Sequence, residues 1–443
     1  MDDAKRFFLS RALGLVIGAG LFGAVSARAE LTYYADIKPV VDQRCATCHQ
    51  PGEIGPFSLT SWEEVYRVRH LVAASVRHGS MPPWPPAAHC NEFDKNISLT
   101  DGERALLLQW VDEGAVQGDP LDAVQPPPAE EEPEYNLALQ LTEPFVPTRT
   151  PDQYRCFILD PALERDTYIR GLDFVPGNRQ IVHHAIGYSI PPENAGDARR
   201  WDADDPGPGF DCMGSVTRGG VPTNSISSWV PGRKNGLLPG GAGLSLKKGS
   251  LIIMQIHYNT VGLQGRILPD RSTLLLHTRD QVEREARSIL LLNPLWAAGF
   301  MRIPAGDPDV SHAYSLTASS FLATYGRALG LDRNDSFSIL SVGLHMHELG
   351  SSGRMWVERA ETNRSECVLD VPSYDFGWQG IYALKNELEV SRNDRIHLEC
   401  HWDNTAGNQP VVNGKRLEPR DTRWGSGTRD EMCLMRILFS RPL

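Results

Sequence analysis

The chain has 443 residues, a formal net charge of -11 at pH 7 and 41% hydrophobic residues. This length is too great for one hydrophobic core and predicts about three domains of ordinary size. The acidic balance argues against nucleic acid and anionic lipid surfaces as partners.

Residues 1–29 have the pattern of a secretory signal peptide. Basic residues near the start precede an apolar run over residues 12–25, and Ala-Arg-Ala at residues 27–29 fits a cleavage site. The apolar run is shorter than the ~20 residues of a spanning helix, which disfavours a membrane anchor. We therefore expect a periplasmic or secreted protein with no stable membrane span after removal of the signal.

Residues 30–122 are expected to form a small all-α domain of the c-type cytochrome kind. Two capping-box patterns, Thr60 to Glu63 and Thr100 to Glu103, precede amphipathic runs and predict helix starts. The run Cys45-Ala-Thr-Cys48-His49 has the spacing for covalent haem attachment, with two thiols for thioether bonds and an adjacent imidazole as an axial ligand.

Met81 is the favoured sixth haem ligand, because it follows a predicted helix and a thioether there would raise the reduction potential. His70, His78 and His89 are the alternatives. Residues 123–135 are rich in proline and glutamate and predict an extended linker.

From residue 136 onward the sequence consists of short apolar or alternating runs separated by Gly, Pro and Asp. This texture predicts a mostly β structure made of sandwiches. Because about 300 residues exceed one sandwich, we divide this part into residues 136–285 and 286–443. The boundary falls at QVEREARS, the least strand-like segment.

Six side chains of this β-rich part make two candidate copper sites. Imidazole suits both oxidation states of copper, and thioether sulfur selects Cu(I). One set has three imidazoles, and the other has two imidazoles and a thioether. The residues are His183, His184 and His257, and then His345, His347 and Met432.

The spacing within each set constrains how it can bind an ion. His345 and His347 lie two apart in the predicted strand SILSVGLHMHELG, which places both on one face. His183 and His184 are neighbours and would point to opposite sides of a regular strand. They can share one metal only at a bulge or a strand end.

The order of the motifs IVHHAIG, MQIHYNT, GLHMHELG and DEMCLM resembles the copper type II, ascorbate-dependent monooxygenases over residues 153–443. The resemblance implies two jelly-roll-like sandwiches, each carrying one copper, that face each other across a cleft. It assigns the three-histidine set to an electron-relay copper, here the H site. It assigns the set with Met432 to the M site, where oxygen and substrate meet.

Eight cysteines fit an oxidising compartment. With Cys45 and Cys48 reserved for haem, the other six can form up to three disulfides, in any of fifteen connectivities. The family resemblance suggests Cys156 with Cys212 and Cys400 with Cys433. Cys90 and Cys367 have no counterpart in the family, and either pair or stay free.

Two departures from the peptide-amidating members of that family concern the substrate. Their arginine two residues before the HxH motif is Gly343 here, and their asparagine and tyrosine after the EMC run are Leu434 and Arg436. A glycine-extended peptide is therefore not expected as the substrate. Nothing in the sequence supports a catechol amine.

The expected protein is an exported dicopper monooxygenase that hydroxylates a C-H bond of a small organic substrate with O2. His345, His347 and Met432 are the expected catalytic ligands. The expected cofactors are two copper ions and one covalently attached haem, which takes electrons from a periplasmic donor or works beside ascorbate.

Two alternatives stay open at this stage. One is a non-catalytic periplasmic copper-binding or electron-transfer protein on the same scaffold. The other is a structural sandwich with zinc or no metal, which Met432 disfavours because zinc rarely takes a thioether ligand. The remaining histidines of the β-rich part are expected to be structural: His277, His312, His397 and His401.

Overall fold

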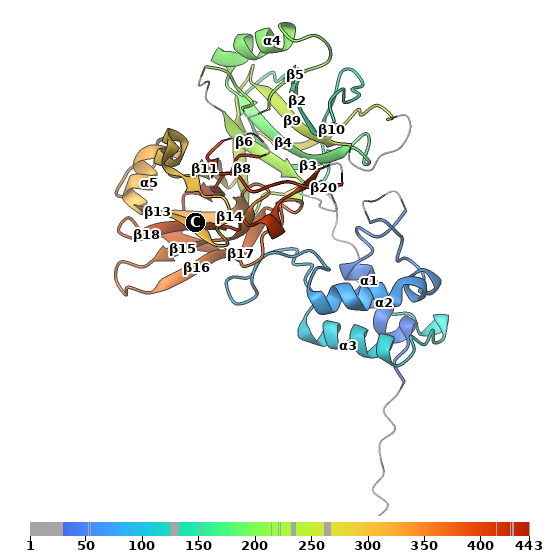
Figure 1. Cartoon of the computed structure of the whole chain (residues 1–443). Coiled ribbons are helices and arrows are strands. Elements are labelled where there is room, and N and C mark those ends of the chain that lie inside the picture. The colour runs from blue at the N-terminus through green and yellow to red at the C-terminus, as the bar shows by residue number, and fades with distance from the viewer. Residues whose placement is uncertain are drawn as a thin grey trace, which may run out of the picture.

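The structure is a computed structural model. It describes residues 30–442 except 52, 54, 125–132, 151, 214, 220, 222, 232–235, 261–266, 413, 426 and 428. The expected signal peptide and most of the expected linker lie outside the described residues. Strands dominate the described part, which confirms the mostly β prediction (Figure 1). Of the helices in that part, none is long and apolar enough to cross a membrane.

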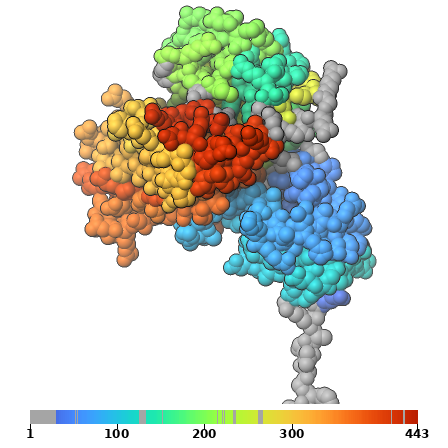
Figure 2. Space-filling view, viewed as in Figure 1, coloured from blue at the N-terminus to red at the C-terminus, as the bar shows by residue number. Residues whose placement is uncertain are grey.

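The N-terminal helices pack around a core of their own. This core contains Tyr33, Ile37, Leu107 and Trp110 among its most buried side chains. In Figure 2 the helices form a lobe beside the two sandwiches. The helical segments are η1 (Tyr33–Ile37), α1 (Lys38–Arg44), α2 (Trp62–His78), α3 (Asp101–Asp112) and η2 (Pro120–Asp122).

One of the two predicted capping boxes is confirmed, and the other is shifted by one residue. Thr100 and Glu103 cap α3 as predicted. Helix α2 instead begins one residue later than predicted, with Ser61 as the N-cap and Glu64 turning back onto it. With the helix beginning at this position, Val65 is buried in the helical core and Glu63 is exposed to solvent. Packing of the helix therefore decides which glutamate completes the capping box.

A segment between α2 and α3 leaves the helices and packs against the β structure (Figure 1). Trp84 and Phe93 contact Tyr382, with ring centroids 5.3 Å and 5.6 Å away, and Phe93 bridges to the strand residue Leu384. Phe93 thus belongs to a sandwich core and not to the helical core. A distinct all-α domain over residues 30–122 is therefore not evident.

The β structure is built on three larger sheets. The five-stranded sheet has the order β5-β2-β9-β4-β6, and the four-stranded sheet has the order β13-β18-β15-β16. The nine-stranded sheet has the order β1-β10-β3-β8-β11-β22-β14-β17, with β7 paired to β3. Their strands are β1 (Leu137–Gln140), β2 (Asp152–Leu159), β3 (Thr167–Val175), β4 (Val182–Ile190), β5 (Phe210–Asp211), β6 (Asn224–Trp229), β7 (Gly236–Leu237), β8 (Ala242–Leu246), β9 (Leu251–Asn259), β10 (Thr273–Arg279), β11 (Arg284–Leu291), β13 (Val310–Thr317), β14 (Phe337–His345), β15 (Gly350–Glu358), β16 (Ser365–Val371), β17 (Tyr382–Val390), β18 (Arg395–Trp402) and β22 (Leu434–Ser440).

Smaller elements complete the β-rich part. Two short ladders pair β12 with β21 and β19 with β20. Helices lie in the connections between strands. These elements are η3 (Pro192–Asn194), α4 (Ala195–Ala203), η4 (Trp296–Phe300), β12 (Arg302–Ile303), α5 (Ala318–Tyr325), η5 (Gly326–Leu329), η6 (Ala406–Asn408), β19 (Val411–Val412), β20 (Lys415–Arg416) and β21 (Thr422–Arg423).

Each half of the nine-stranded sheet packs against a different partner sheet. Side chains of β1, β10, β3 and β8 share one core with the five-stranded sheet, and side chains of β22, β14 and β17 share another with the four-stranded sheet. On β9, Ile252, Met254 and Ile256 face the first core, while Gln255 and His257 lie on the opposite face. The histidines of this sheet therefore lie outside its hydrophobic core.

Strand β11 lies across the expected boundary at residue 285. It covers Arg284–Leu291, so part of the segment taken as least strand-like forms a strand that joins the two halves of the large sheet. The charged residue Arg284 can be buried there because it forms an ion pair with Glu387 and donates to the carbonyl oxygen of Gly240.

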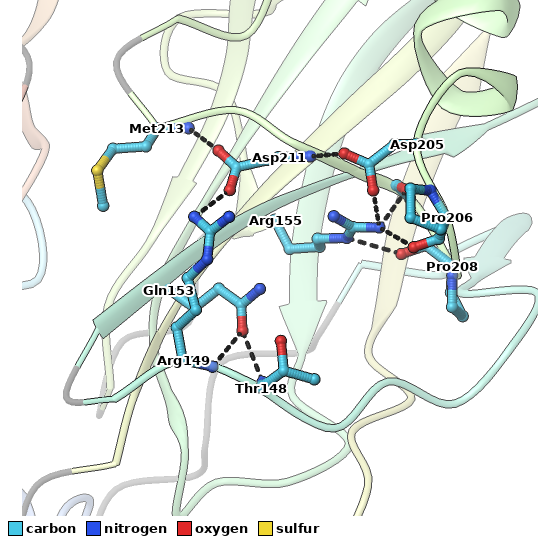
Figure 3. Close-up of polar contacts among 10 residues, drawn as sticks. Thr148, Arg149, Gln153, Arg155, Asp205, Pro206, Pro208, Asp211 and Met213 are labelled. Carbon is cyan, nitrogen blue, oxygen red and sulfur yellow. Dashed lines mark hydrogen bonds and ion pairs between the residues drawn. The ribbon is translucent and has the colours of Figure 1, made fainter.

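A buried arginine anchors strand β2 to the loop before β5 (Figure 3). Arg155 forms an ion pair with Asp205 at 2.8 Å and donates to the carbonyl oxygens of Pro208 and Gly209. The loop before β5 is thereby fixed against the sheet. This loop leads to Cys212, whose disulfide partner Cys156 lies on β2.

The cysteines of the described chain form three disulfides. The pairs Cys156–Cys212 and Cys400–Cys433 confirm the two that the family resemblance suggested. Cys90 pairs with Cys367, which lies on β16 and is 277 residues further along the chain. This third disulfide holds the segment between α2 and α3 against the C-terminal sandwich.

We predict that replacing both Cys90 and Cys367 by serine lowers the free energy of unfolding by about 2 to 5 kcal/mol, because a long covalent loop is opened. Calorimetry or urea unfolding of the oxidised proteins would measure the loss. The unaltered protein under reducing conditions provides the comparison. An unchanged unfolding midpoint in the double variant would contradict the clamping role of this disulfide.

Candidate metal centres

Three histidines converge on the outer face of the five-stranded sheet. His183 and His184 lie on β4, His257 lies on β9, and their ligand atoms all lie within 4.8 Å of one another. The Nδ1 atom of His184 is 3.3 Å from Nδ1 of His183 and 3.4 Å from Nδ1 of His257. We call these three residues the H cluster.

A bulge explains how adjacent histidines reach one point. The pairing of β4 with β9 shifts register between Val182 and His184, which leaves His183 as the extra residue. A bulge re-aims a side chain that a regular strand would point away. The structure therefore has the bulge that His183 and His184 need in order to share one ion.

Asp152 fixes the ring of His257. Its Oδ1 atom lies 2.8 Å from Nε2 of His257 and 2.9 Å from the amide nitrogen of Asn259. Since a carboxylate can only accept, Nε2 carries the proton and Nδ1 keeps its lone pair for the cluster. Burial raises the pKa of Asp152, but the hydrogen bonds from His257 and Asn259 outweigh it and leave the pKa lowered. Tyr154 stacks on the same ring at 4.3 Å.

Two rings of the H cluster, His183 and His184, are neutral at pH 7. Burial and the neighbouring His257 lower the pKa of His183 to about 4, and burial with the surrounding imidazoles places the pKa of His184 well below its usual value. Neutral imidazoles are the form that binds metal ions, so no proton has to leave these two rings first.

The second pair of histidines lies at the end of β14. The strand ends at His345, so His347 lies beyond it although the predicted strand SILSVGLHMHELG included both histidines. The alternation nevertheless continues, because Met346 enters the sandwich core. His345 and His347 therefore both turn to the other side, with ring centroids 5.2 Å apart.

Hydrogen bonds orient both rings. Nδ1 of His345 contacts Oε1 of Gln379, and Nδ1 of His347 lies 2.9 Å from the carbonyl oxygen of Asp430. Both partners are acceptors, so each Nδ1 donates and each Nε2 keeps its lone pair. Burial and His347 lower the pKa of His345 to about 3, which keeps it neutral.

Glu431 ties the Met432 segment to the HxH motif. Its buried carboxylate accepts hydrogen bonds from the backbone N-H groups of His347 and Leu349, at 3.0 Å and 2.7 Å, and from the indole of Trp402 at 2.8 Å. The N-H of Met432 also points to it, at 3.3 Å. Burial raises the pKa of Glu431 to about 7. We call His345, His347 and Met432 the M cluster.

One cavity of about 330 Å³ connects the two clusters. Its walls include His184 of the H cluster and all three residues of the M cluster. Arg436 is half-buried in this wall, donates to Ser288 at 2.9 Å, and is paired with Gly343 across the β14–β22 ladder. The remaining lining is largely apolar or hydroxyl-bearing and includes Ile186, Tyr188, Leu344, Ile381 and Leu434.

The CxxCH motif has features that suit a haem ligand set. The Cys45 and Cys48 thiols are free, unlike the other cysteines of the described chain. Nδ1 of His49 lies 3.0 Å from the carbonyl oxygen of Phe57, which leaves Nε2 for an iron atom. A Cβ at Gly55 would come within 2.6 Å of the His49 ring, so the loop closes tightly around it.

The candidates for the sixth haem position lie elsewhere on the helical part. Met81 follows the end of α2, is 41% exposed and precedes Pro82 through a cis peptide bond. His70 and His78 are exposed on α2, and His89 faces Asp370 at 3.3 Å. Met81 therefore stays a prediction.

The four histidines expected to be structural make hydrogen bonds within the sandwiches. His277 binds the carbonyl of Glu134, and His312 binds the backbone of Arg302. His397 and His401 contact the carboxylates of Glu358, Asp309 and Glu399.

The comparisons with known proteins concern the C-terminal sandwich. Residues 331–442 match the model of the copper type II ascorbate-dependent monooxygenase C-terminal domain. This match supports the family resemblance, contains the whole M cluster and indicates a copper oxidoreductase. Enzymes of the matched family use ascorbate and O2 as co-substrates. A comparison with curated proteins finds no match.

Solved structures with a distant likeness include a structure of infectious bursal disease virus, Gt strain, and the VP2 subviral particle of that virus. Each is 10% identical, with 71% of this chain and 79% of the other covered, at TM-scores of 0.17 and 0.16. At these TM-scores the likeness carries no argument.

We predict that Asp152→Ala weakens copper binding at the H cluster by about 10- to 100-fold, because the His257 ring loses its orienting partner. Competition with a colorimetric chelator would measure the affinity. Asp166→Ala, which removes an exposed carboxylate paired with Lys247, is the matched control. Equal affinities in both variants would show that Asp152 does not orient a ligand.

Proposed function

We propose that this protein is an exported copper monooxygenase that hydroxylates a C-H bond of a small organic substrate with O2. The observation that carries the proposal is the placement of the H cluster and the M cluster around one cavity. Three imidazoles form one set, and two imidazoles with a nearby thioether form the other. Such sets suit a copper ion that exchanges electrons and a copper ion held as Cu(I), respectively.

Bound copper would supply the one-electron and oxygen chemistry that side chains lack. The chain itself holds and orients the ligands. Asp152, Gln379 and the Asp430 carbonyl fix the tautomers of their histidines, and Glu431 holds the backbone of Met432 near His347. These contacts preserve the ligand geometry when the oxidation state of the ion changes.

The cavity between the clusters suits a small substrate. Its volume of about 330 Å³ lies at the lower end for ligand pockets. Apolar side chains such as Ile186, Leu344 and Ile381 line it next to His345 and exclude water from the place where a C-H bond would lie. The cavity therefore favours a compact organic molecule over a long peptide.

We further propose that a haem attached at Cys45 and Cys48 supplies electrons to the H cluster. Glu53, four residues after His49, forms an ion pair with Arg179 at 2.5 Å. Arg179 lies four residues before His183, in the connection that leads into β4. The proposed haem loop thus contacts the loop that leads into the strand of the electron-relay ligands. A periplasmic donor or ascorbate would supply the electrons.

The proposed location is the periplasm or the exterior. Three disulfides are typical of proteins from oxidising compartments. The expected signal peptide and the haem attachment motif agree with this location.

We predict that His345→Ala removes about one of two bound copper ions and abolishes substrate-dependent oxygen consumption, because the M cluster loses a ligand. Metal analysis and an oxygen electrode, with a panel of small organic substrates, would measure both. His401→Ala, a histidine held by Asp309 and Glu399, is the control. Full copper loading with no oxygen consumption above background in the unaltered protein would instead favour a copper-binding protein.

We also predict that Arg179→Glu slows the transfer of electrons from reduced haem to copper several-fold, because like charges at residues 53 and 179 push the two loops apart. Flash photoreduction followed by haem absorbance would measure the rate. Arg199→Glu, which breaks a surface pair with Asp160, is the matched control. Equal rates in both variants would place electron entry elsewhere, and a protein that never shows a haem spectrum would refute the haem itself.

A further inference from the structure

The connection between β16 and β17 touches both clusters. Within it, residues 374–379 read Tyr-Asp-Phe-Gly-Trp-Gln, and we call them the intersite loop. The hydroxyl of Tyr374 donates to the carbonyl oxygen of Met346 at 2.7 Å and accepts from its N-H at 2.9 Å. Gln379 binds the Nδ1 atom of His345 at the other end of the loop. The loop is therefore fastened at both ends to the HxH motif.

Phe376 lies in the middle of this loop and contacts one histidine of each cluster. Its ring centroid is 6.5 Å from that of His183, with the planes 30° apart, and 6.0 Å from that of His347, with the planes 76° apart. The sum of these distances, 12.5 Å, is the largest separation that the two imidazole centroids can have. One aromatic ring thus lies within contact range of both ligand sets.

The backbone of the loop holds this ring in place. The side chain of Gln379 donates to the carbonyl oxygen of Phe376 at 2.9 Å, so one amide fixes both His345 and Phe376. The N-H of Gly377 and the N-H of Trp378 bind Asp375 in a tight turn. A side chain carried on such a turn has little freedom to move aside.

Core packing does not account for Phe376. Its neighbour Tyr374 packs against the C-terminal core, but Phe376 is half-buried and belongs to no hydrophobic core of the described chain. Its ring contacts are with two histidines from different sandwiches. The ring thus occupies space between the two ligand sets.

We propose that Phe376 is a positioning residue that sets the separation of the H and M clusters and keeps water out of the direct path between them. This inference rests on the proposed function, in which both clusters hold copper. The ring would replace water between the two ligand sets by a fixed aromatic contact. Electrons leaving the H cluster would then cross a gap of constant width from which water is excluded.

Two measurements on Phe376→Ala and Phe376→Leu test the proposal, and neither depends on turnover. In the copper-loaded protein, the half-field electron paramagnetic resonance signal falls steeply with the distance between two Cu(II) ions. In the metal-free protein, diethyl pyrocarbonate modifies imidazoles that water can reach, and mass spectrometry locates the modified residues. Phe300→Ala, which removes an exposed phenylalanine on η4, is the matched control.

We expect Phe376→Ala to change the half-field intensity several-fold at unchanged copper content, and to speed modification of His183 and His347 several-fold. Phe376→Leu should show smaller changes, because the leucine side chain still occupies part of the space between the two ligand sets with apolar atoms. Unchanged half-field intensity and unchanged histidine reactivity in Phe376→Ala would overturn the positioning role. Failure of the unaltered protein to bind copper would refute the proposed function instead, and the metal-free measurement would still decide the role of Phe376.

Discussion

The hydrogen-bonded ladder of β11, β22 and β14 is the constraint on which the site depends. These strands make the two sandwiches parts of one nine-stranded sheet, so neither half can turn freely against the other. His345 is the last residue of strand β14, and β22 begins two residues after Met432. The five-stranded sheet, with the H cluster on its outer face, packs on the other half of the same sheet. The shared sheet therefore brings the two sandwiches, and with them the two clusters, to one cavity.

The sequence predicted what depends on local spacing. The HxH motif, the strand texture and the need for a bulge at His183 follow from the two-residue period of a strand, and the structure has that bulge. Contacts between distant segments carried no such signal. Gln379, Phe376 and Asp152 look like ordinary loop or strand residues in the sequence, and only folding places them against histidines. Glu431 lay within the DEMC motif, but its role depends on Trp402 and the HxH backbone.

The helical part shows the same limit of sequence analysis. Its helices and one of its capping boxes were predictable, because they depend on neighbours within one turn. The packing of Trp84 and Phe93 against Tyr382 was not, since nothing in their own segment identifies a partner almost 300 residues away. That packing and the ion pair between Glu53 and Arg179 attach the helical part to both sandwiches. The CxxCH loop consequently has a defined neighbour on the H-cluster side.

The disulfide between Cys90 and Cys367 has a consequence for biogenesis. Because 277 residues separate the two cysteines, the Cys90 thiol of an exported chain would have no partner until most of the chain had crossed into the oxidising compartment. During that interval Cys45 and Cys48 are the nearest thiols in the sequence to Cys90. Attachment of the proposed haem to Cys45 and Cys48 would prevent wrong disulfides with Cys90. Haem attachment would therefore have to precede oxidation of the other cysteines.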